Sequence, residues 1–340
     1  MRMPAEWEKH AATLLAWPHH EKDWPGKFAP IPWVYGEIIR YLAAHEPVKL
    51  LVQDAREKIK ATAILKRAGV NLKNIDLRII PTNRVWLRDS GPIYVKTGKK
   101  KLMLDWKFTA WAKYPNHQLD NKVPAALNSK DKILRIEPIH KGKRVVLEGG
   151  SIDVNGQGVL LTTEECLLSE IQCRNPGFIR RDYEAVFEKY LGIEQVIWLG
   201  RGIEGDDTHG HVDDLARFTN ESTIVTVIER NKKDANYAPL QDNLKRLKKA
   251  RNQHGKPFTI IELPMPRPLI FEGTRLPASY ANFYIANGLV LVPTFNDPAD
   301  RAALSILAEC FPGREVIGIH AVDLVWGFGT LHCMSQQEPL

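Results

Sequence analysis

Residues 282–292 read Asn-Phe-Tyr-Ile-Ala-Asn-Gly-Leu-Val-Leu-Val, two apolar runs on either side of an Asn-Gly pair. Asn-Gly between β-rich runs is the strongest short-range signal of a β-hairpin. A helix-compatible segment follows at residues 300–310, and a short apolar run comes after it at residues 315–319. The stretch therefore predicts a unit of two paired strands, a helix and a third strand.

The same pattern recurs elsewhere along the chain. Further candidate strand pairs lie at residues 93–104, 151–162 and 215–227. Further segments in which a helix-compatible run leads into a short apolar run lie at residues 183–198 and 239–263. Degenerate repetition of one strand-strand-helix-strand unit indicates a single pseudo-symmetric α/β domain over residues 1–340 rather than two unrelated domains.

Composition predicts an ordinary globular protein. Of the 340 residues, 44% are hydrophobic and 26% are charged, and no uninterrupted apolar run is long enough to span a bilayer. The start of the chain lacks the apolar region of a signal peptide. The four cysteines have no Cys-x-x-Cys spacing, which favours a reducing compartment. We therefore expect a cytoplasmic protein without a membrane partner.

The charge pattern bears on binding partners. The formal net charge is +7, and much of the excess lies in the helix-compatible run at residues 245–251. Such a run can bind nucleic acid, but no nucleic-acid-binding signature accompanies it, so we interpret it as a solvated helix face. In contrast, residues 204–214 are strongly acidic, which suits a small cationic substrate. The oligomeric state, including a homo-oligomer, stays open.

Cys333 is the first candidate for chemistry. It lies in residues 326–337, Trp-Gly-Phe-Gly-Thr-Leu-His-Cys-Met-Ser-Gln-Gln, far from any other cysteine. The reactive form of a catalytic cysteine is the thiolate, which needs neighbouring groups to exist near neutral pH. Residues 208–214, Thr-His-Gly-His-Val-Asp-Asp, supply histidines and carboxylates for that purpose. The alternative for Cys333 is a buried structural thiol, because free cysteine is among the most buried residue types.

Two further segments carry candidate carboxylates. In residues 86–92, Trp-Leu-Arg-Asp-Ser-Gly-Pro, Asp89 can bind a cation or simply pair with Arg88 in a loop. In residues 147–150, Glu148 precedes two glycines at the start of a predicted hairpin, where ordinary turn chemistry is the alternative.

A zinc hydrolase is the rival interpretation of the histidine motif. The spacing of His209, His211 and Asp213 is close to the zinc-binding signature of metallo-β-lactamase-like hydrolases. That signature ends in a further histidine, however, and position 214 is aspartate. A zinc site would also leave Cys333 and the Glu-Gly-Gly segment without a role.

Taken in order, the four motifs WxRDxGP, EGG, GDDTxGHVD and GxxHCxxQQ resemble the agmatine deiminase family. That family is related to bacterial peptidylarginine deiminases within the guanidino-group-modifying superfamily. The likeness extends from residues 3–7 through residues 278–284 to residues 336–337. It implies an α/β-propeller of about five ββαβ units in pseudo-five-fold arrangement around a central active site. The repetition described above agrees with that fold.

The resemblance also implies a role for each motif. Cys333 would attack the guanidino carbon of the substrate as a thiolate. His211 would protonate the departing ammonia and then activate the water that hydrolyses the intermediate, with Glu148 orienting and charge-stabilising the histidine. Asp89 and Asp213 would hold the guanidinium nitrogens through charge-assisted hydrogen bonds.

The implied substrate is agmatine, hydrolysed to N-carbamoylputrescine on the way to putrescine in polyamine biosynthesis. Trp86 would form a wall of the substrate channel, where its face can contact a cation. Asp207 is the implied partner of the distal amine of the substrate. No metal or organic cofactor is required by this chemistry.

Departures from the family pattern leave other substrates open. Members that act on agmatine usually carry Asp-Glu-Thr where this chain has Asp-Asp-Thr at residues 206–208. Position 209 is histidine rather than asparagine or aspartate, and residues 327–331 lack the common run of three glycines followed by Asn-Ile. A longer or differently charged guanidine, free arginine or a peptidyl-arginine terminus therefore remain as alternative substrates. An amidino transferase would use similar residues.

Overall fold

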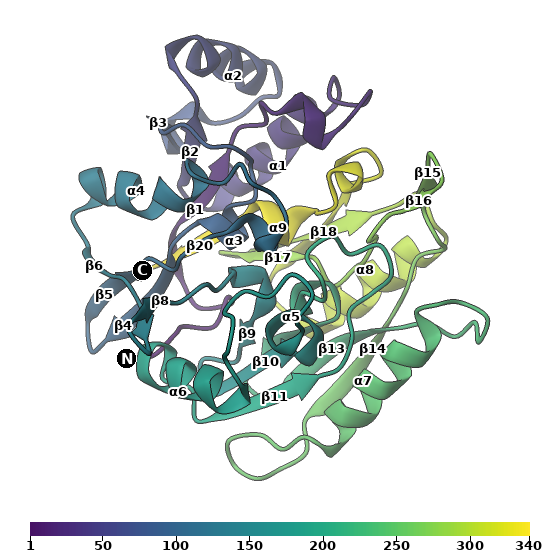
Figure 1. Cartoon of the computed structure of the whole chain (residues 1–340). Coiled ribbons are helices and arrows are strands. Elements are labelled where there is room, and N and C mark those ends of the chain that lie inside the picture. Colours follow the sequence, from purple (N-terminus) through teal and green to yellow (C-terminus); the bar gives the residue numbers. More distant parts are fainter.

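The computed structural model describes all residues from 1 to 340. Five sheets of three or four strands follow one another around the middle of the molecule, together with two short two-stranded ribbons (Figure 1). The short helices α3 (Leu87–Ser90) and α9 (Leu331–Met334) lie in that middle. The predicted α/β class is confirmed, and the arrangement of the sheets agrees with the predicted propeller.

Four of the sheets have the same topology, an antiparallel hairpin followed by a helical connection and a strand parallel to the second one. The first comprises β4 (Ile93–Thr97), β5 (Lys100–Leu104), α4 (Val123–Asp131) and β6 (Leu134–Ile136). The second comprises β9 (Asp153–Val154), β10 (Val159–Thr163), α5 (Glu164–Leu168), α6 (Arg180–Leu191) and β11 (Gln195–Leu199). The third comprises β12 (Ala216–Asn220), β13 (Thr223–Ile228), α7 (Tyr237–Lys249) and β14 (Thr259–Pro264). The fourth comprises β17 (Tyr284–Ala286), β18 (Leu289–Thr294), α8 (Ala299–Cys310) and β19 (Glu315–His320).

The fifth sheet joins the two ends of the chain. Its strand order is β20 (Gln336–Pro339), β1 (His10–Ala16), β2 (Val48–Val52) and β3 (Ile75–Ile79). The C-terminal strand β20 runs antiparallel to β1, and β1, β2 and β3 are parallel. The connecting helices are α1 (Ile31–His45) and α2 (Ala55–Arg67). Because β20 begins just after α9, closure of this sheet fixes the segment that carries Cys333.

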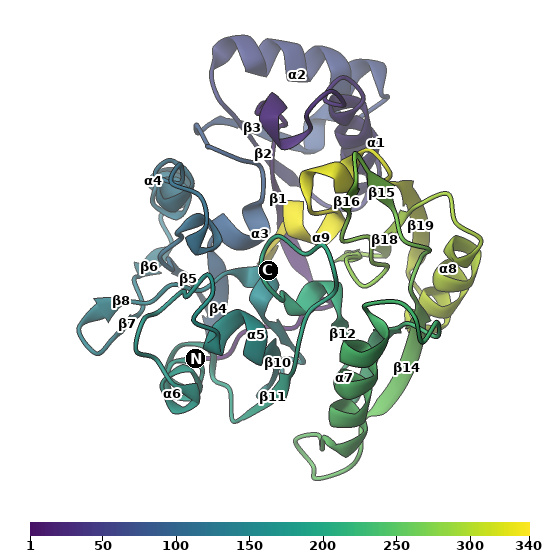
Figure 2. The same ribbon diagram turned by 45° about the vertical axis from the view of Figure 1, so that its right-hand side comes forward.

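The helices pack through one apolar face, as their sequences dictate. Figure 2 shows α2, α6 and α8 at the periphery of the molecule. In α7, Leu240, Leu244 and Leu247 are buried, whereas Lys245 and Lys249 are exposed. The basic run of residues 245–251 is therefore a solvated face, as we interpreted it. None of the helices is both long and apolar enough to cross a membrane.

The two remaining ribbons are β7 (Ile139–His140) with β8 (Lys143–Arg144), and β15 (Ile270–Phe271) with β16 (Thr274–Arg275). The central strands β10 and β18 are buried almost throughout, as their Val- and Leu-rich sequences require.

Candidate active site

A cavity of about 420 Å³ opens in the middle of the molecule, next to α3 and α9. Three tryptophans form much of its lining: Trp86, Trp111 and Trp326. Asp89 and Cys333 are the two predicted reactive side chains that reach it. His211, Glu148 and Asp213 do not line the cavity and lie one layer deeper, next to Asp89 and Cys333.

Cys333 is buried, yet its sulfur is held among polar groups. Asn282 Nδ2 donates a hydrogen bond to Cys333 Sγ over 3.0 Å, and Asp213 Oδ2 lies 3.6 Å from the same sulfur. Burial and the neighbouring carboxylates of Asp213, Asp214 and Asp89 raise the pKa of the Cys333 thiol well above its usual value. In the free protein this cysteine is therefore a neutral thiol at neutral pH. Cys333 also lines the cavity, so its burial does not by itself favour the alternative of a structural thiol.

Asp89 projects from α3 into the cavity and is held there by two donors. The backbone N–H of Gly150 donates to Oδ1 over 2.9 Å, and Trp111 Nε1 donates to Oδ2 over 2.9 Å. Burial, reinforced by the nearby carboxylates, raises the pKa of Asp89 to about 6. Its sequence neighbour Arg88 turns away and donates to Gln337 and Glu6. The alternative of a simple Asp89–Arg88 loop pair is therefore wrong.

Asp213 lies on the short helix η6 (Val212–Asp214) and is fully buried. His332 Nδ1 lies 2.7 Å from Asp213 Oδ2, and His332 Nε2 lies 2.8 Å from Glu6 Oε2. Burial opposes ionisation of Asp213, but His332 and His211 outweigh burial and lower its pKa. The second oxygen, Oδ1, is buried without a hydrogen-bond partner. A buried carboxylate oxygen without a partner is suited to accept a hydrogen bond from a cationic ligand.

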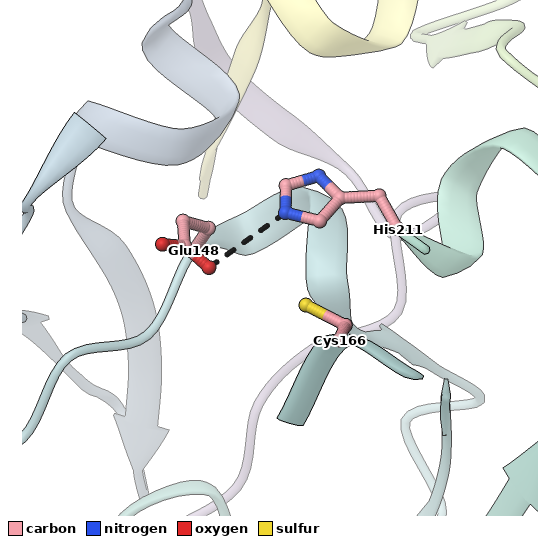
Figure 3. Close-up of side chains that lie close together, drawn as sticks. All are labelled: Glu148, Cys166 and His211. Atoms are coloured by element: carbon pink, nitrogen blue, oxygen red, sulfur yellow. Dashed lines mark ion pairs between the residues drawn. The ribbon is translucent and has the colours of Figure 1, made fainter. Parts of the chain in front are cut away.

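His211 lies between three carboxylates without touching any of them at hydrogen-bond distance. Its Nε2 is 3.7 Å from Glu148 Oε2, an ion pair that Figure 3 marks, and its Nδ1 is 3.8 Å from Asp89 Oδ1 and 4.0 Å from Asp213 Oδ1. Burial favours the neutral imidazole, but Asp89, Cys166 and Glu148 outweigh burial and hold the pKa of His211 well above its ordinary value. The imidazolium can therefore supply a proton at neutral pH.

Glu148 is kept ionised by a fully buried arginine. Arg174 Nε donates to both carboxylate oxygens of Glu148 over 3.2 Å, and Arg174 also donates to the backbone carbonyl of Thr208. Burial raises the pKa of Glu148, but Arg174 and His211 outweigh burial, so the pKa is lowered overall. Arg174 thus ties the Glu-Gly-Gly segment to the loop that carries His211.

The glycines after Glu148 allow this close approach. A Cβ on Gly150 would lie 2.5 Å from His211 Nδ1 and 2.8 Å from Asp89 Oδ1. Any side chain there would displace both groups, so the second glycine is required by packing and not only by the turn at η5 (Gly149–Ser151).

Trp86 and Asp207 both line the cavity, as the resemblance implied for a channel wall and a distal contact. Asp207 is not free, however. Lys113 forms a salt bridge with its Oδ1, and the Tyr114 hydroxyl donates to its Oδ2 over 2.8 Å. A cationic substrate tail that binds Asp207 would have to share the carboxylate with Lys113.

The zinc set of the rival interpretation is not assembled. His209 Nε2 lies 3.1 Å from Ser169 Oγ, and His209 lines a second, separate pocket. The two buried clusters that bring together three side chains able to bind a metal are Glu148 with Cys166 and His211, and Asp213 with Asp214 and Cys333. Neither group contains His209.

Sequence reasoning missed several residues that support the site. The missed residues are Glu6, Trp111, Cys166, Arg174, Asn282 and His332. Trp111 reaches Asp89 from η3 (Ala110–Ala112), three consecutive non-glycine residues with φ of 47°, 59° and 53°. Strained backbone of this kind often accompanies functional sites. Only Glu6, Asn282 and His332 stood within stretches that the sequence analysis had singled out.

Comparisons with known proteins identify the family of the chain. Residues 2–339 match the model of the Porphyromonas-type peptidyl-arginine deiminase family. An agmatine deiminase of Ectopseudomonas mendocina is 33% identical over 363 residues, which cover 99% of this chain and 95% of that protein.

Two solved structures are similar over their whole length. The agmatine deiminase of Enterococcus faecalis has a TM-score of 0.90 and 30% identity, covering 99% of this chain and 95% of that chain. A substrate-bound agmatine deiminase of C. jejuni has a TM-score of 0.88 and 32% identity, covering 99% of this chain and 96% of that chain. The chain therefore belongs to the family of Porphyromonas-type peptidyl-arginine deiminases, together with the agmatine deiminases that it resembles.

Proposed function

We propose that this protein is a cysteine-dependent deiminase that hydrolyses agmatine to N-carbamoylputrescine and ammonia. The observation that carries the proposal is the position of Cys333, with its Sγ beside Asp213 and its side chain in the lining of a cavity that Asp89 also lines. A planar guanidinium that donates to both carboxylates would present its carbon to the sulfur. The agmatine deiminases at 30–33% identity support agmatine as the substrate.

Binding of the substrate activates the nucleophile in this proposal. In the free protein the carboxylates of Asp89 and Asp213 repel a thiolate at Cys333. A guanidinium bound between them would neutralise their charge and attract the thiolate, which lowers the pKa of Cys333. The thiol proton leaves to solvent, and the thiolate forms a C–S bond to the guanidino carbon. The resulting tetrahedral adduct has lost the resonance that makes a guanidinium a poor electrophile.

His211 then transfers protons in both halves of the reaction. As imidazolium it protonates one amino group of the adduct, the C–N bond breaks, and ammonia departs to leave a cationic thiouronium on Cys333. The neutral imidazole next takes a proton from water, and the hydroxide adds to the same carbon. Collapse breaks the C–S bond, and the hydroxyl proton passes to the departing sulfur, which regenerates the neutral thiol and yields the neutral ureido product. Glu148 stabilises the imidazolium that forms in the second half.

The experiment that tests the proposal measures ammonia release from a panel of guanidines. The panel contains agmatine, arginine, a peptide with C-terminal arginine and longer guanidinoalkylamines, each with and without iodoacetamide and EDTA. We expect agmatine turnover that alkylation abolishes and that EDTA leaves unchanged. Faster turnover of arginine or of the peptide than of agmatine would make that compound the assigned substrate. If no guanidine of the panel releases ammonia, the proposal is contradicted.

The predicted cytoplasmic location belongs to the same proposal. All four cysteines are free, which suits an enzyme of a reducing compartment. Fractionation of cells that express the tagged protein tests this location, and enrichment in an oxidising compartment would contradict it.

A further inference from the structure

Cys166 is a buried thiol beside the proposed acid-base group, and no step of the proposed reaction uses it. It lies on α5, is 1% exposed, and places its sulfur within 4.8 Å of a ring nitrogen of His211 and a carboxylate oxygen of Glu148. Figure 3 shows the sulfur pointing toward the space between the imidazole and the carboxylate. The three side chains come from separate segments of the chain, so only the folded protein brings them together.

The orientation of the His211 ring is not fixed by ordinary hydrogen bonds. Both ring nitrogens are buried without a hydrogen-bond partner. The carboxylate oxygens of Glu148, Asp89 and Asp213 lie 3.7, 3.8 and 4.0 Å away, beyond the usual N–H···O distance. In the proposed reaction the ring gives a proton to the leaving nitrogen and takes one from the attacking water, both at the guanidino carbon. The ring therefore needs a fixed position, and packing against its neighbours has to hold it there.

The segment of Cys166 is tied directly to the segment of His211. The backbone N–H of Cys166 donates to Thr163 Oγ1 over 3.0 Å, and Thr163 Oγ1 in turn donates to the carbonyl of Gly210 over 2.5 Å. Gly210 immediately precedes His211, and a Cβ on Gly210 would lie 3.0 Å from Glu165. The loop that carries His211 therefore rests on the start of α5, so the backbone positions of Cys166 and His211 are fixed relative to each other.

We infer that Cys166 is a positioning residue that holds the imidazole of His211 in place for proton transfer, an inference that rests on the proposed deiminase function. The thiol is suited to the task because sulfur is large, polarisable and only a weak hydrogen-bond donor and acceptor. It fills the space under the ring without displacing the stronger interaction with Glu148. On its other side Cys166 packs into the apolar cluster that contains Tyr183 and Val186.

Four groups face the ring of His211. They come from four elements: Asp89 from α3, Glu148 from the segment before η5, Asp213 from η6 and Cys166 from α5. Arg174 pairs with Glu148, the carboxylate nearest to the ring. Burial lowers the pKa of His211, and Cys166 is among the neighbours that raise it. Loss of the sulfur should therefore lower the pKa of His211 as well as loosen the ring.

The test compares Cys166→Ala and Cys166→Ser with the control Cys310→Ala, which alters a partly exposed cysteine on α8. Steady-state rates with agmatine are measured across pH for each variant. In Cys166→Ala we expect kcat to fall by about 10- to 100-fold with KM nearly unchanged, the size of effect that a small misplacement of a catalytic group produces. The limb of the pH profile that reports His211 should move to lower pH. Cys166→Ser should retain more activity than Cys166→Ala, and the control should match the wild type.

Two further measurements keep the inference open to contradiction. Thermal unfolding separates misfolding from misplacement. If Cys166→Ala does not fold, the test rests on Cys166→Ser. A Cys166→Ser variant with the melting temperature, the rate and the pH profile of the wild type overturns the inference. Titration of the His211 ring by NMR, without substrate, should give a lower pKa in the folded Cys166 variant than in the wild type, and equal values also overturn it. Because the titration needs no turnover, it decides the role of Cys166 even if the wild type releases no ammonia from any guanidine.

Discussion

Cys333 and His211 both lie close to Asp213, and both of their pKa values are raised. Burial and carboxylates raise the pKa of the thiol, whereas Asp89, Cys166 and Glu148 outweigh burial at the imidazole. In the proposed reaction, the thiol therefore stays neutral until a cation arrives between Asp89 and Asp213, and the imidazolium holds the proton for ammonia.

Alkylation tests the state of the thiol. Because the pKa of Cys333 is raised, the thiolate fraction is small at neutral pH and grows as pH rises. Iodoacetamide should therefore modify Cys333 of the free protein slowly near pH 7 and progressively faster at alkaline pH, as measured by peptide mass spectrometry. The partly exposed Cys173 serves as the internal reference. Fast modification of Cys333 that does not depend on pH would contradict this account.

The pKa of Asp89 predicts the acid limb of substrate binding. This pKa is raised to about 6, so Asp89 in the free enzyme loses its negative charge as pH falls through that value. A neutral carboxyl binds a guanidinium more weakly, and KM for agmatine should rise below pH 6 while it changes little above. In Asp89→Asn, KM should be high at every pH. Saturation curves between about pH 5 and pH 8 test this, and a flat KM in the wild type argues against it.

The sequence could single out candidate reactive residues, but few of the residues that support them. Asp89, Glu148, His211 and Cys333 stand in motifs that resemble those of a known family, and their proposed roles stay predictions. Arg174 and Cys166 carry no such signal, because what makes them relevant is the tertiary contact with Glu148 and His211. Asn282 lay in a predicted strand, yet the structure places it before β17 with its amide on the sulfur of Cys333.

At the level of elements, the Glu-Gly-Gly turn is the part of the site with the least space. In Gly150→Ala the new methyl group would lie 2.5 Å from His211 Nδ1, so the ring has to move. We expect kcat to fall by about 100-fold, because misplacement of a catalytic group by about 1 Å can reduce the rate by that factor.

Gly98→Asn is the matched control for that substitution. Gly98 has a φ of +56° and nothing within 4 Å of an added Cβ, and asparagine tolerates the left-handed conformation. Its activity and stability should match the wild type. Equal kcat values in Gly150→Ala and the control would show that the turn does not position His211.

The hairpins of four of the five main sheets could be predicted, because Asn-Gly or similar turns mark them. The helix and the parallel strand that follow were predicted for three of these sheets, but α4 and the short strand β6 were not. The fifth sheet escaped prediction because β1 pairs with β20 at the other end of the chain, so no local turn signals the contact. Helix α6 begins three residues earlier than predicted, because Asp182 accepts a hydrogen bond from the N–H of Ile179 and extends the first turn.

For the whole molecule, the structure predicts that closure by β20 couples stability to activity. Glu338 on β20 forms salt bridges with Lys49 on β2 and Lys101 on β5, and all four residues of β20 are buried. Hydrogen bonds to charged groups contribute about 1.5–3 kcal/mol each. Deletion of residues 336–340 should therefore lower the free energy of unfolding by at least about 3 kcal/mol and abolish activity.

Urea unfolding and ammonia release, measured on the same preparations, check this prediction. Deletion of the exposed Leu340 alone is the control and should leave both nearly unchanged. A deletion variant without residues 336–340 that keeps wild-type activity would show that Cys333 is positioned independently of β20.

The most direct test of the central claim is the detection of the covalent intermediate on Cys333. The wild-type protein is mixed with agmatine, quenched rapidly in acid and digested for mass spectrometry. We predict that the peptide with Cys333 gains the mass of agmatine minus ammonia, and that Cys333→Ala forms no adduct while it still binds agmatine. Turnover without any adduct, or an adduct on another cysteine, would contradict the account.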